Sequence, residues 1–355
     1  MTKQAKLRTA LSVSVAVAAL MAGGTWANAA EQPGDPCSQP GEVKPLGSGA
    51  IECINGRWAP SSKPVAGAPV GNPTGAPGVP GTPPKAPVMA KTAGIFTPVG
   101  PVLTQDTFGG TGKQVADPSA IRLADGRIRL YSWVNPTGLR TATSTDATGT
   151  KFVAESVAPL KTMAGQPRAV RVDADRIRLF YTSAGTITSA ISSDNGLTFT
   201  EEGPVITTAQ AGFEPGTLSL VKVGGTYRAY FSNLEKPGER AERIMRTATS
   251  TDMLTWTMGP QLAMSGSHPF ALVDAKGKIA LYYAADRGSS YGIFVSTSTN
   301  GTTFTGEKFV IAGGGDADII STGKNKWLMY YGSEVSPTMG FGVLVARSLT
   351  NAIPK

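Results

Sequence analysis

Histidine is almost absent from this chain of 355 residues, since His268 is the only one. A single histidine excludes zinc sites built from several histidines, and no G-x-S-x-G motif accompanies it to indicate a serine hydrolase. The chain also lacks a phosphate-binding loop and a dinucleotide-binding fingerprint, because the glycines at 313–315 stand alone between two expected strands. No run of basic residues marks a nucleic-acid surface, so we expect no nucleic-acid partner.

Long apolar runs are scarce as well. The N-terminal run, residues 11–21, follows Lys3, Lys6 and Arg8, and the small residues at 27–29 supply a cleavage site. This is the pattern of a secretory signal peptide, and the run is too short for a membrane anchor. We therefore expect residues 1–29 to be removed, and a secreted or periplasmic monomer without a membrane span. The formal net charge of +8 falls to +5 when the three basic residues of this segment are lost.

Only two cysteines are present, Cys37 and Cys53. In an oxidising compartment they are expected to form a disulfide, which would stabilise a small module of residues 30–59 by roughly 3 kcal/mol. Whether the module also binds a ligand stays open. Residues 60–91 are dominated by Pro, Gly and Ala, a composition that predicts an extended linker. The main domain is then expected at 92–355.

A repeat runs through this domain. Five similar segments begin at Asp117, Gln166, Glu214, His268 and Asp316, with spacings of 49, 48, 54 and 48 residues. Each has an apolar strand, a Gly-containing turn and an alternating strand that ends in aromatic residues, and two further strands follow. Four antiparallel strands in units of this length predict an all-β fold, a β-propeller of five blades.

The last unit lacks a fourth strand after residue 348. Residues 94–103, GIFTPVGPVL, resemble the fourth strand of the second unit, residues 197–206, LTFTEEGPVI. We therefore expect the N-terminal strand to pair with the strand around residues 343–347 and to close the ring. Closure would remove the open sheet edges that an all-β protein must otherwise protect.

The five segments each begin with a residue at the head of an innermost strand. These heads are expected to converge on one mouth of the central channel, with residues from the second strands around the rim: Trp133, Asn233, Asp286 and Arg287. Polar groups gathered in a concavity are the usual form of a binding site. The competing interpretation is structural, in which each head only caps its strand.

At these residues the chain resembles the five-bladed glycoside hydrolases of the family 43 type, with relatives in family 32. The resemblance rests on "DPS" at 117–119, "EPG" at 214–216 and "SGSHPF" at 265–270, in successive blades. It implies that Asp117 is the general base and Glu214 the general acid of an inverting glycosidase. It also matches His268 to a histidine that these enzymes often carry in the fourth blade. With the heads Gln166 and Asp316, His268 is expected to contact the substrate.

The second blade departs from the family pattern. It reads "QPRAV", so Arg168 stands where the resemblance places a carboxylate that tunes the acid. A guanidinium beside Glu214 would lower the pKa of its carboxyl, whereas a general acid needs a raised one. Arg168 is alternatively a fork for an anionic group of an acidic sugar. The departure leaves two hypotheses, a glycosidase and a non-catalytic glycan-binding or surface protein. No cofactor is expected beyond a channel-bound ion such as calcium.

The segment "SSDNGLTF", residues 192–199, fits the Asp-box pattern completely. Asp boxes lie in turns that are distant from active sites. We expect Asp194 to accept hydrogen bonds from local backbone amides and Phe199 to anchor the turn. Its role is therefore predicted to be structural.

Overall fold

The computed structural model describes residues 37–40, 42–46, 49–55, 57–61, 95–110, 114–155, 160–234, 243–287, 290–336 and 339–353. The chain divides into two compact units, residues 1–84 and 85–355. The expected signal peptide and residues 62–91 of the expected linker lie outside the described residues. Within the described ranges, no helix has the length and apolar character needed to cross a membrane.

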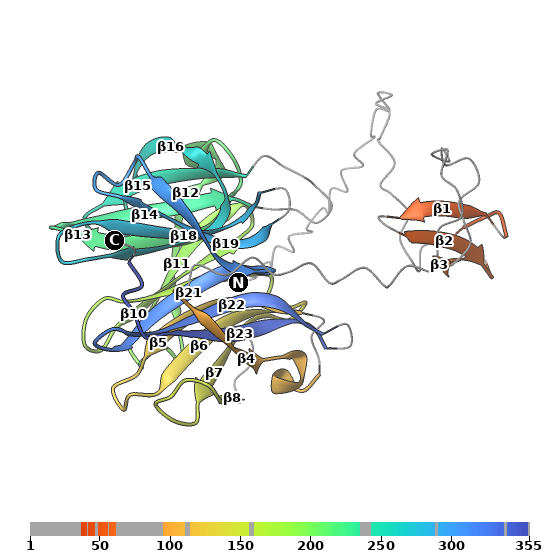
Figure 1. Ribbon diagram of the computed structural model, residues 1–355, viewed down its shortest axis with the longest axis horizontal. Coiled ribbons are helices and arrows are strands. Elements are labelled where there is room, and N and C mark those ends of the chain that lie inside the picture. Colours follow the sequence, from red (N-terminus) through yellow and green to blue (C-terminus); the bar gives the residue numbers. More distant parts are fainter. Residues whose placement is uncertain are drawn as a thin grey trace, which may run out of the picture. The chain divides into compact units, whose positions relative to one another are not determined.

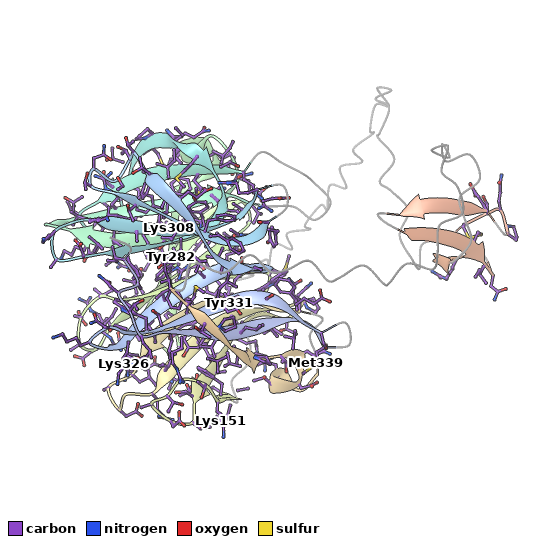
Figure 2. The ribbon with its side chains drawn as sticks, in the orientation of Figure 1. Lys151, Tyr282, Lys308, Lys326, Tyr331 and Met339 are labelled. Carbon is purple, nitrogen blue, oxygen red and sulfur yellow. A yellow bond between two sulfur atoms is a disulfide. The ribbon has the colours of Figure 1, made fainter. Side chains whose placement is uncertain are left out.

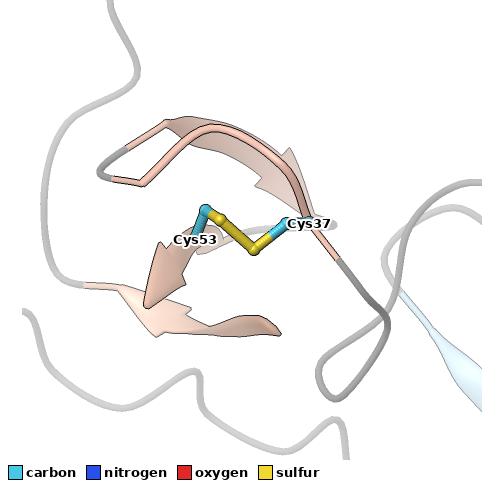
Figure 3. The surroundings of a disulfide bond; sticks show 2 residues. All are labelled: Cys37 and Cys53. Carbon is cyan, nitrogen blue, oxygen red and sulfur yellow. A yellow bond between two sulfur atoms is a disulfide. The ribbon is translucent and has the colours of Figure 1, made fainter. Parts of the chain in front are cut away.

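The first unit contains one three-stranded antiparallel sheet, made by β1 (Val43–Leu46), β2 (Gly49–Ile54) and β3 (Arg57–Ser61). The predicted disulfide is confirmed: Cys37 and Cys53 are bonded, with their Cα atoms 5.8 Å apart (Figure 3). Cys53 lies on β2 and is buried. The bond fastens the chain before β1 to the central strand of a sheet too small to bury much core.

The second unit is all-β, as predicted, with one short helix, α1 (Thr208–Ala211), and one 3₁₀ turn (Gln105–Phe108) in its described part (Figure 1). Three four-stranded antiparallel sheets have their strands in chain order. Sheet II comprises β9 (Gly165–Arg171), β10 (Ile177–Ser183), β11 (Thr186–Ser192) and β12 (Thr200–Thr207). Sheet III comprises β13 (Pro215–Val223), β14 (Thr226–Asn233), β15 (Ile244–Ser250) and β16 (Thr257–Ser265). Sheet IV comprises β17 (Ser267–Val273), β18 (Ile279–Asp286), β19 (Tyr291–Ser298) and β20 (Thr305–Ala312).

The other eight strands form one sheet with two antiparallel halves. Sheet I is the half made by β5 (Gln114–Arg122), β6 (Ile128–Asn135), β7 (Gly138–Ser144) and β8 (Phe152–Ala154). Sheet V is the half made by β21 (Gly314–Gly323), β22 (Lys326–Ser336), β23 (Gly340–Ser348) and β4 (Thr97–Leu103). A single parallel pair, Phe341 with Gln114, joins the two halves.

The predicted pairing of the N-terminal strand is confirmed. β4 runs antiparallel to β23, with Leu103 opposite Val343 and Thr97 opposite Arg347 (Figure 1). Strands about 240 residues apart in sequence therefore complete one four-stranded sheet. The match between residues 94–103 and the fourth strand of sheet II was sufficient to locate this strand.

Hydrophobic clusters fill the spaces between successive sheets. One cluster joins sheets I and II, and others join II to III, III to IV, IV to V, and V back to I. Tyr282 of sheet IV and Tyr331 of sheet V lie in one such interior cluster, whereas Lys151 is exposed at the margin (Figure 2). The contacts between sheets therefore form a closed cycle.

Buried tyrosines follow the same cycle. Each lies on the second strand of its sheet and donates its hydroxyl to a main-chain carbonyl of the next: Tyr131 to Gly196 (2.9 Å), Tyr230 to Gly301 (3.0 Å), Tyr282 to Ala352, and Tyr330 to Gly149 (2.8 Å). Sheet II has Phe180 at this place, which packs in one cluster with Met253 and Trp256 of sheet III. Gly196 has φ +87°, and a Cβ there would lie 2.0 Å from the Tyr131 hydroxyl, so the turn requires glycine.

The turn at residues 192–199 has the predicted structural role. The Asp194 carboxylate accepts hydrogen bonds from the amides of Leu197 and Thr198, each at 3.0 Å. Although partial burial opposes it, hydrogen bonding from Ser192 and Thr198 lowers the pKa of Asp194. Phe199 packs edge-to-face on Tyr131, 5.9 Å between ring centroids. The turn therefore fastens sheet II to sheet I.

Candidate functional site

Four polar residues occupy the same place in the innermost strands of four sheets: Asp117 in β5, Gln166 in β9, His268 in β17 and Asp316 in β21. Each is the first of two residues that face a single residue of the second strand, so each begins a β-bulge. Their φ angles are +52°, +51°, +50° and +55°. This left-handed conformation is uncommon for residues other than glycine, and a bulge redirects the side chain it carries.

The prediction that Glu214 is the fifth member of this set is wrong. In β13 the bulge lies between Pro215 and Leu218, so Gly216 takes the place of Asp117. Glu214 comes two residues earlier, at the level of Val115 in β5. The dipeptide Glu-Pro imitates Asp-Pro in the sequence, but the hydrogen-bond register places this proline before the bulge instead of within it.

Glu214 instead faces the turn between β10 and β11. Its side chain lies near Gly185, where an added Cβ would be 3.9 Å from Glu214 Oε1 and 3.5 Å from Thr208 Oγ1. Its carbonyl accepts a hydrogen bond from the Leu234 amide (2.8 Å), and the residue is half-buried. The carboxylate is therefore beside sheet II and α1.

Asp117, His268 and Asp316 form one cluster at the bulges. His268 Nε2 lies 3.3 Å from Asp316 Oδ1 and 3.8 Å from Asp117 Oδ1. Gln166 Nε2 lies 3.1 Å from His268 Nε2, and Ser267 Oγ lies 3.2 Å from His268 Nδ1. The three ionisable side chains are between 9% and 14% exposed, so the cluster is largely removed from solvent but not closed.

The two carboxyl groups affect each other. Burial, and next the charge of Asp316, raise the pKa of Asp117 to about 7, while His268 opposes the shift. The backbone amide of Gln166 donates a hydrogen bond to Asp117, which also opposes the shift. A carboxyl that is partly protonated near neutral pH can accept or donate a proton there, which is the property of a general acid or base.

The raised pKa of Asp117 gives a pH dependence of stability with a definite sign. The carboxyl titrates near 3.8 in the unfolded chain and near 7 in the folded protein, so folding favours its protonated form. This stabilisation is complete below pH 3.8 and is lost as the pH rises through 7. We expect the free energy of unfolding to fall by about 2 kcal/mol from about pH 5 to about pH 8 through this group. Asp117→Asn should abolish that fall.

Urea unfolding in a chelating buffer at the two pH values measures this difference. Asp125→Asn is the matched control, because Asp125 is exposed in the turn that follows the same strand. The control should keep the fall seen in the wild type. Equal falls in the wild type and in Asp117→Asn would contradict the assignment.

A second layer lies directly after the bulges. Its five members come from the five innermost strands: Ser119, Arg168, Leu218, Phe270 and Asp318. Arg168 pairs with Asp318, donates from Nε to the Leu218 carbonyl (3.0 Å) and stacks over the Phe270 ring (4.9 Å to its centroid). Asp318 also accepts hydrogen bonds from the Ser119 hydroxyl and the Ala120 amide. One ion pair therefore contacts all five sheets.

This layer corrects the expected role of Arg168. The side chain was expected to face the substrate and Glu214, but it is 5% exposed and its guanidinium is engaged by Asp318, Leu218 and Phe270. Burial raises the pKa of Asp318, and the Arg168 charge opposes the shift. An anionic sugar group therefore has no support from Arg168, which instead holds the strands that carry the bulges.

The four predicted rim residues differ in their surroundings. Trp133 is half-buried beside Gly165, next to Gln166. The Asn233 side-chain oxygen accepts a hydrogen bond from the Ile244 amide (2.8 Å), which holds the start of β15. Arg287 pairs with Glu307 (2.8 Å), and Asp286 is exposed at the end of β18. Trp133 therefore lies beside the residue that precedes Gln166 in β9.

No protein-family model and no curated protein matches the chain, but solved structures do. An endo-1,4-β-xylanase from Bacteroides thetaiotaomicron is 16% identical with a TM-score of 0.51, over 66% of this chain and 90% of that one. A family 43 β-xylosidase/α-arabinofuranosidase from a compost metagenome, solved with xylotriose in a calcium-free form, is 18% identical. Its TM-score is 0.51, over 73% of this chain and 97% of that one. The chain has the β-propeller fold of family 43-type glycoside hydrolases.

The cluster has the composition of a site for a hard cation. One ligand atom each from Asp117, His268 and Asp316 lie within 4.8 Å of one another. Gln166 Oε1 is buried and has no hydrogen-bond partner among the described residues. Two carboxylates and an amide oxygen are donors that calcium prefers, and water would complete its coordination. These residues fit the expected channel-bound ion, which stays a prediction.

Two residues of the site were missed from the sequence. Gly332 makes room for Asp316, because a Cβ at 332 would lie 2.6 Å from Asp316 Oδ2. Asp318 follows Asp316 by two residues, as Arg168 follows Gln166. Because Arg168 and Asp318 are oppositely charged and lie at equivalent positions of two repeats, their ion pair could have been predicted from the sequence. The need for glycine at position 332 could not be predicted, since it depends on the Asp316 side chain of the adjacent strand.

Proposed function

We propose that the protein acts on carbohydrate as a glycoside hydrolase, through the cluster at the bulges of the innermost strands. The observation that carries the proposal is the convergence of Asp117, Gln166, His268 and Asp316 at one level of a fold shared with glycoside hydrolases. Sheets I to V are the five blades of the propeller, and β4 completes the fifth. The cluster then lies at one mouth of the central channel, where a sugar would enter.

The proposed reaction is hydrolysis with inversion. Asp117 accepts a proton from the attacking water while Glu214 donates a proton to the leaving oxygen, so the glycosidic bond breaks as the new bond to water forms. Inversion requires the two carboxyl groups to be roughly 6.5–9.5 Å apart to admit the water. A pKa of Asp117 near 7 suits a group that must be ionised at or above neutral pH. Gln166, His268 and Trp133 supply substrate contacts.

One observation favours a second function, non-catalytic glycan binding. Glu214 lies two residues before the bulge of sheet III, where Gly216 stands, and Arg168 takes the place of the second-blade carboxylate. A cluster with a single carboxyl of the catalytic set can still bind sugar hydroxyls through Gln166, His268 and Asp316. Turnover decides between the two functions.

The test is a screen of the protein against aryl glycosides and oligosaccharides, xylo-oligosaccharides among them, with calorimetry on the same ligands. Hydrolysis should fall by about 100-fold or more in Asp117→Asn and in Glu214→Gln, because each removes a proton-transfer group. Asp125→Asn is the matched control and should keep full activity. Glycan binding without turnover, unchanged in both variants, would instead establish the binding protein.

We also propose that the protein is exported, with residues 1–29 as its signal peptide. The Cys37–Cys53 disulfide supports this, since such bonds persist in oxidising compartments. Export would bring the propeller to extracellular or periplasmic polysaccharide. The length of the secreted chain, measured by mass spectrometry, tests the cleavage site.

A further inference from the structure

A cavity lies at the other end of the innermost strands, beyond the layer of Arg168 and Asp318. Its volume is about 360 Å³, and all five innermost strands line it. Arg168, Asp318 and Phe270 form its floor, which separates it from the cluster at the bulges. The cavity is therefore distinct from the candidate site.

Two arginines of the lining, Arg122 and Arg171, are bonded only to carbonyls. Arg122 donates to the carbonyls of Gly126 (3.0 Å) and Ser321 (3.2 Å). Arg171 donates to the carbonyls of Ala174 and Arg122, both at 3.0 Å. A guanidinium carries five N–H groups, so both retain donors. In the part of the chain that the structure describes, no carboxylate lies close enough to either arginine to form an ion pair.

The hairpin turns around this cavity add to the positive charge. These turns contain nine lysines and arginines but only four aspartates, counted over the segments 122–128, 171–177, 222–226, 274–279 and 323–326. Two of the aspartates, Asp125 and Asp173, are already bonded to Arg127 and Arg176 of the same turns. A basic surplus around a concavity raises the local concentration of anions.

The walls of the cavity are aliphatic. Val170, Leu220 and Ile320 line it and are half-buried, so each leaves apolar surface in contact with water. Covering such surface with an apolar ligand group is favourable. An occupant that satisfies both parts of the lining therefore needs an aliphatic body and an anionic head.

We propose that this cavity is a second ligand site, for a small amphiphilic oxyanion. Its carboxylate or phosphate head accepts hydrogen bonds from Arg122 and Arg171, whose planar forks fit either group. Its aliphatic chain lies against Val170, Leu220 and Ile320. The site does not depend on the proposed hydrolase activity, because the Arg168–Asp318 layer stands between the two.

Calorimetric titration of the protein with octanoate, octyl phosphate and octanol tests the site. We expect saturable binding of the anions, with a Kd on the order of 1 mM for a ligand of this size, and at least tenfold weaker binding of octanol. The tighter of the two anions identifies the head group. Raising the salt concentration should weaken anion binding, since exposed charges are screened.

Arg122→Gln with Arg171→Gln should weaken octanoate binding by about tenfold or more, because two charge-assisted contacts are lost. Arg127→Gln with Arg176→Gln is the matched control, in the same turns but outside the lining. It removes the same charge without a direct contact, so it should weaken octanoate binding by less than about threefold. Leu220→Phe fills the cavity without changing its charge and should also weaken binding. Thermal melts establish that each variant is folded. Three results would each overturn the proposal: octanol bound as tightly as octanoate, no saturable binding, or unchanged binding in the variant that carries Arg122→Gln and Arg171→Gln.

Discussion

Arg168→Ala is expected to reduce the free energy of unfolding by about 3–5 kcal/mol, a large part of the stability of an ordinary domain. The substitution leaves Asp318 buried with its charge uncompensated, in a layer that touches all five sheets. It also removes the hydrogen bond to the Leu218 carbonyl and the stacking on Phe270. Urea unfolding measures the loss, and Asp318→Ala should produce one of similar size.

The double substitution Arg168→Met with Asp318→Leu separates charge from packing. Replacing both partners of a buried pair by apolar groups avoids the unpaired charge, so most of the stability should return. Arg176→Ala is the matched control, because its pair with Asp173 is exposed and contributes about 0–1 kcal/mol. A loss below about 1 kcal/mol in Arg168→Ala would show that the layer is not what holds the innermost strands together.

If the layer does position the bulges, the effect of Arg168 on function should be indirect. A substrate contact would change substrate affinity in a protein of unchanged stability. A positioning residue changes stability first, and the double apolar variant should recover both stability and any activity. This contrast distinguishes the buried role that the structure shows from the anion-binding role expected from the sequence.

The strand pattern was predictable because it is local. Alternating apolar residues, a Gly-containing turn and terminal aromatic residues recur in each unit. In the structure, the tyrosines among these aromatic residues donate hydrogen bonds from one sheet to the next. The pairing of β4 with β23 was also predictable, since a missing strand at one end and a matching segment at the other leave one arrangement. The strand pattern depends on neighbouring residues, and the pairing of β4 depends on the similarity between repeats, so both can be predicted from the sequence.

The site was only partly predictable, because it depends on register. Four of the site residues could be aligned because each directly precedes a proline or an alanine: Asp117, Gln166, His268 and Asp316. In the structure, the side chains of the other three lie within 4 Å of His268. Glu214 was misplaced, since a shift of two residues in a strand leaves its alternation intact and cannot be read from the pattern. Arg168 was identified, but its partner lies 150 residues away and contact at that separation is set by the closed cycle of sheets.

The last strand of the cycle leads to the largest expected effect. β4 supplies the outer strand of sheet V. Two side chains of the segment 95–103 are fully buried, Phe96 directly before β4 and Leu103 at its end. Phe96 packs edge-to-face on Tyr282 of sheet IV, 6.2 Å between centroids, and Leu103 lies in the cluster between sheets V and I. Removing the segment therefore affects three sheets and exposes an edge of β23.

Deletion of residues 92–104 should abolish cooperative unfolding of the second unit. The loss of two fully buried large side chains alone costs about 5 kcal/mol or more, and the unpaired backbone of β23 adds to it, which together approaches the total stability of most domains. Circular dichroism and calorimetric melts should show a broad transition in place of a sharp one. A deletion of equal length at 70–82, outside the described residues, is the control and should melt like the intact protein. A synthetic peptide of residues 92–104 should restore the sharp transition by occupying the free edge. If the shortened protein melts like the intact one, the sheets do not need β4, and the closure of the propeller by its N-terminal strand is wrong.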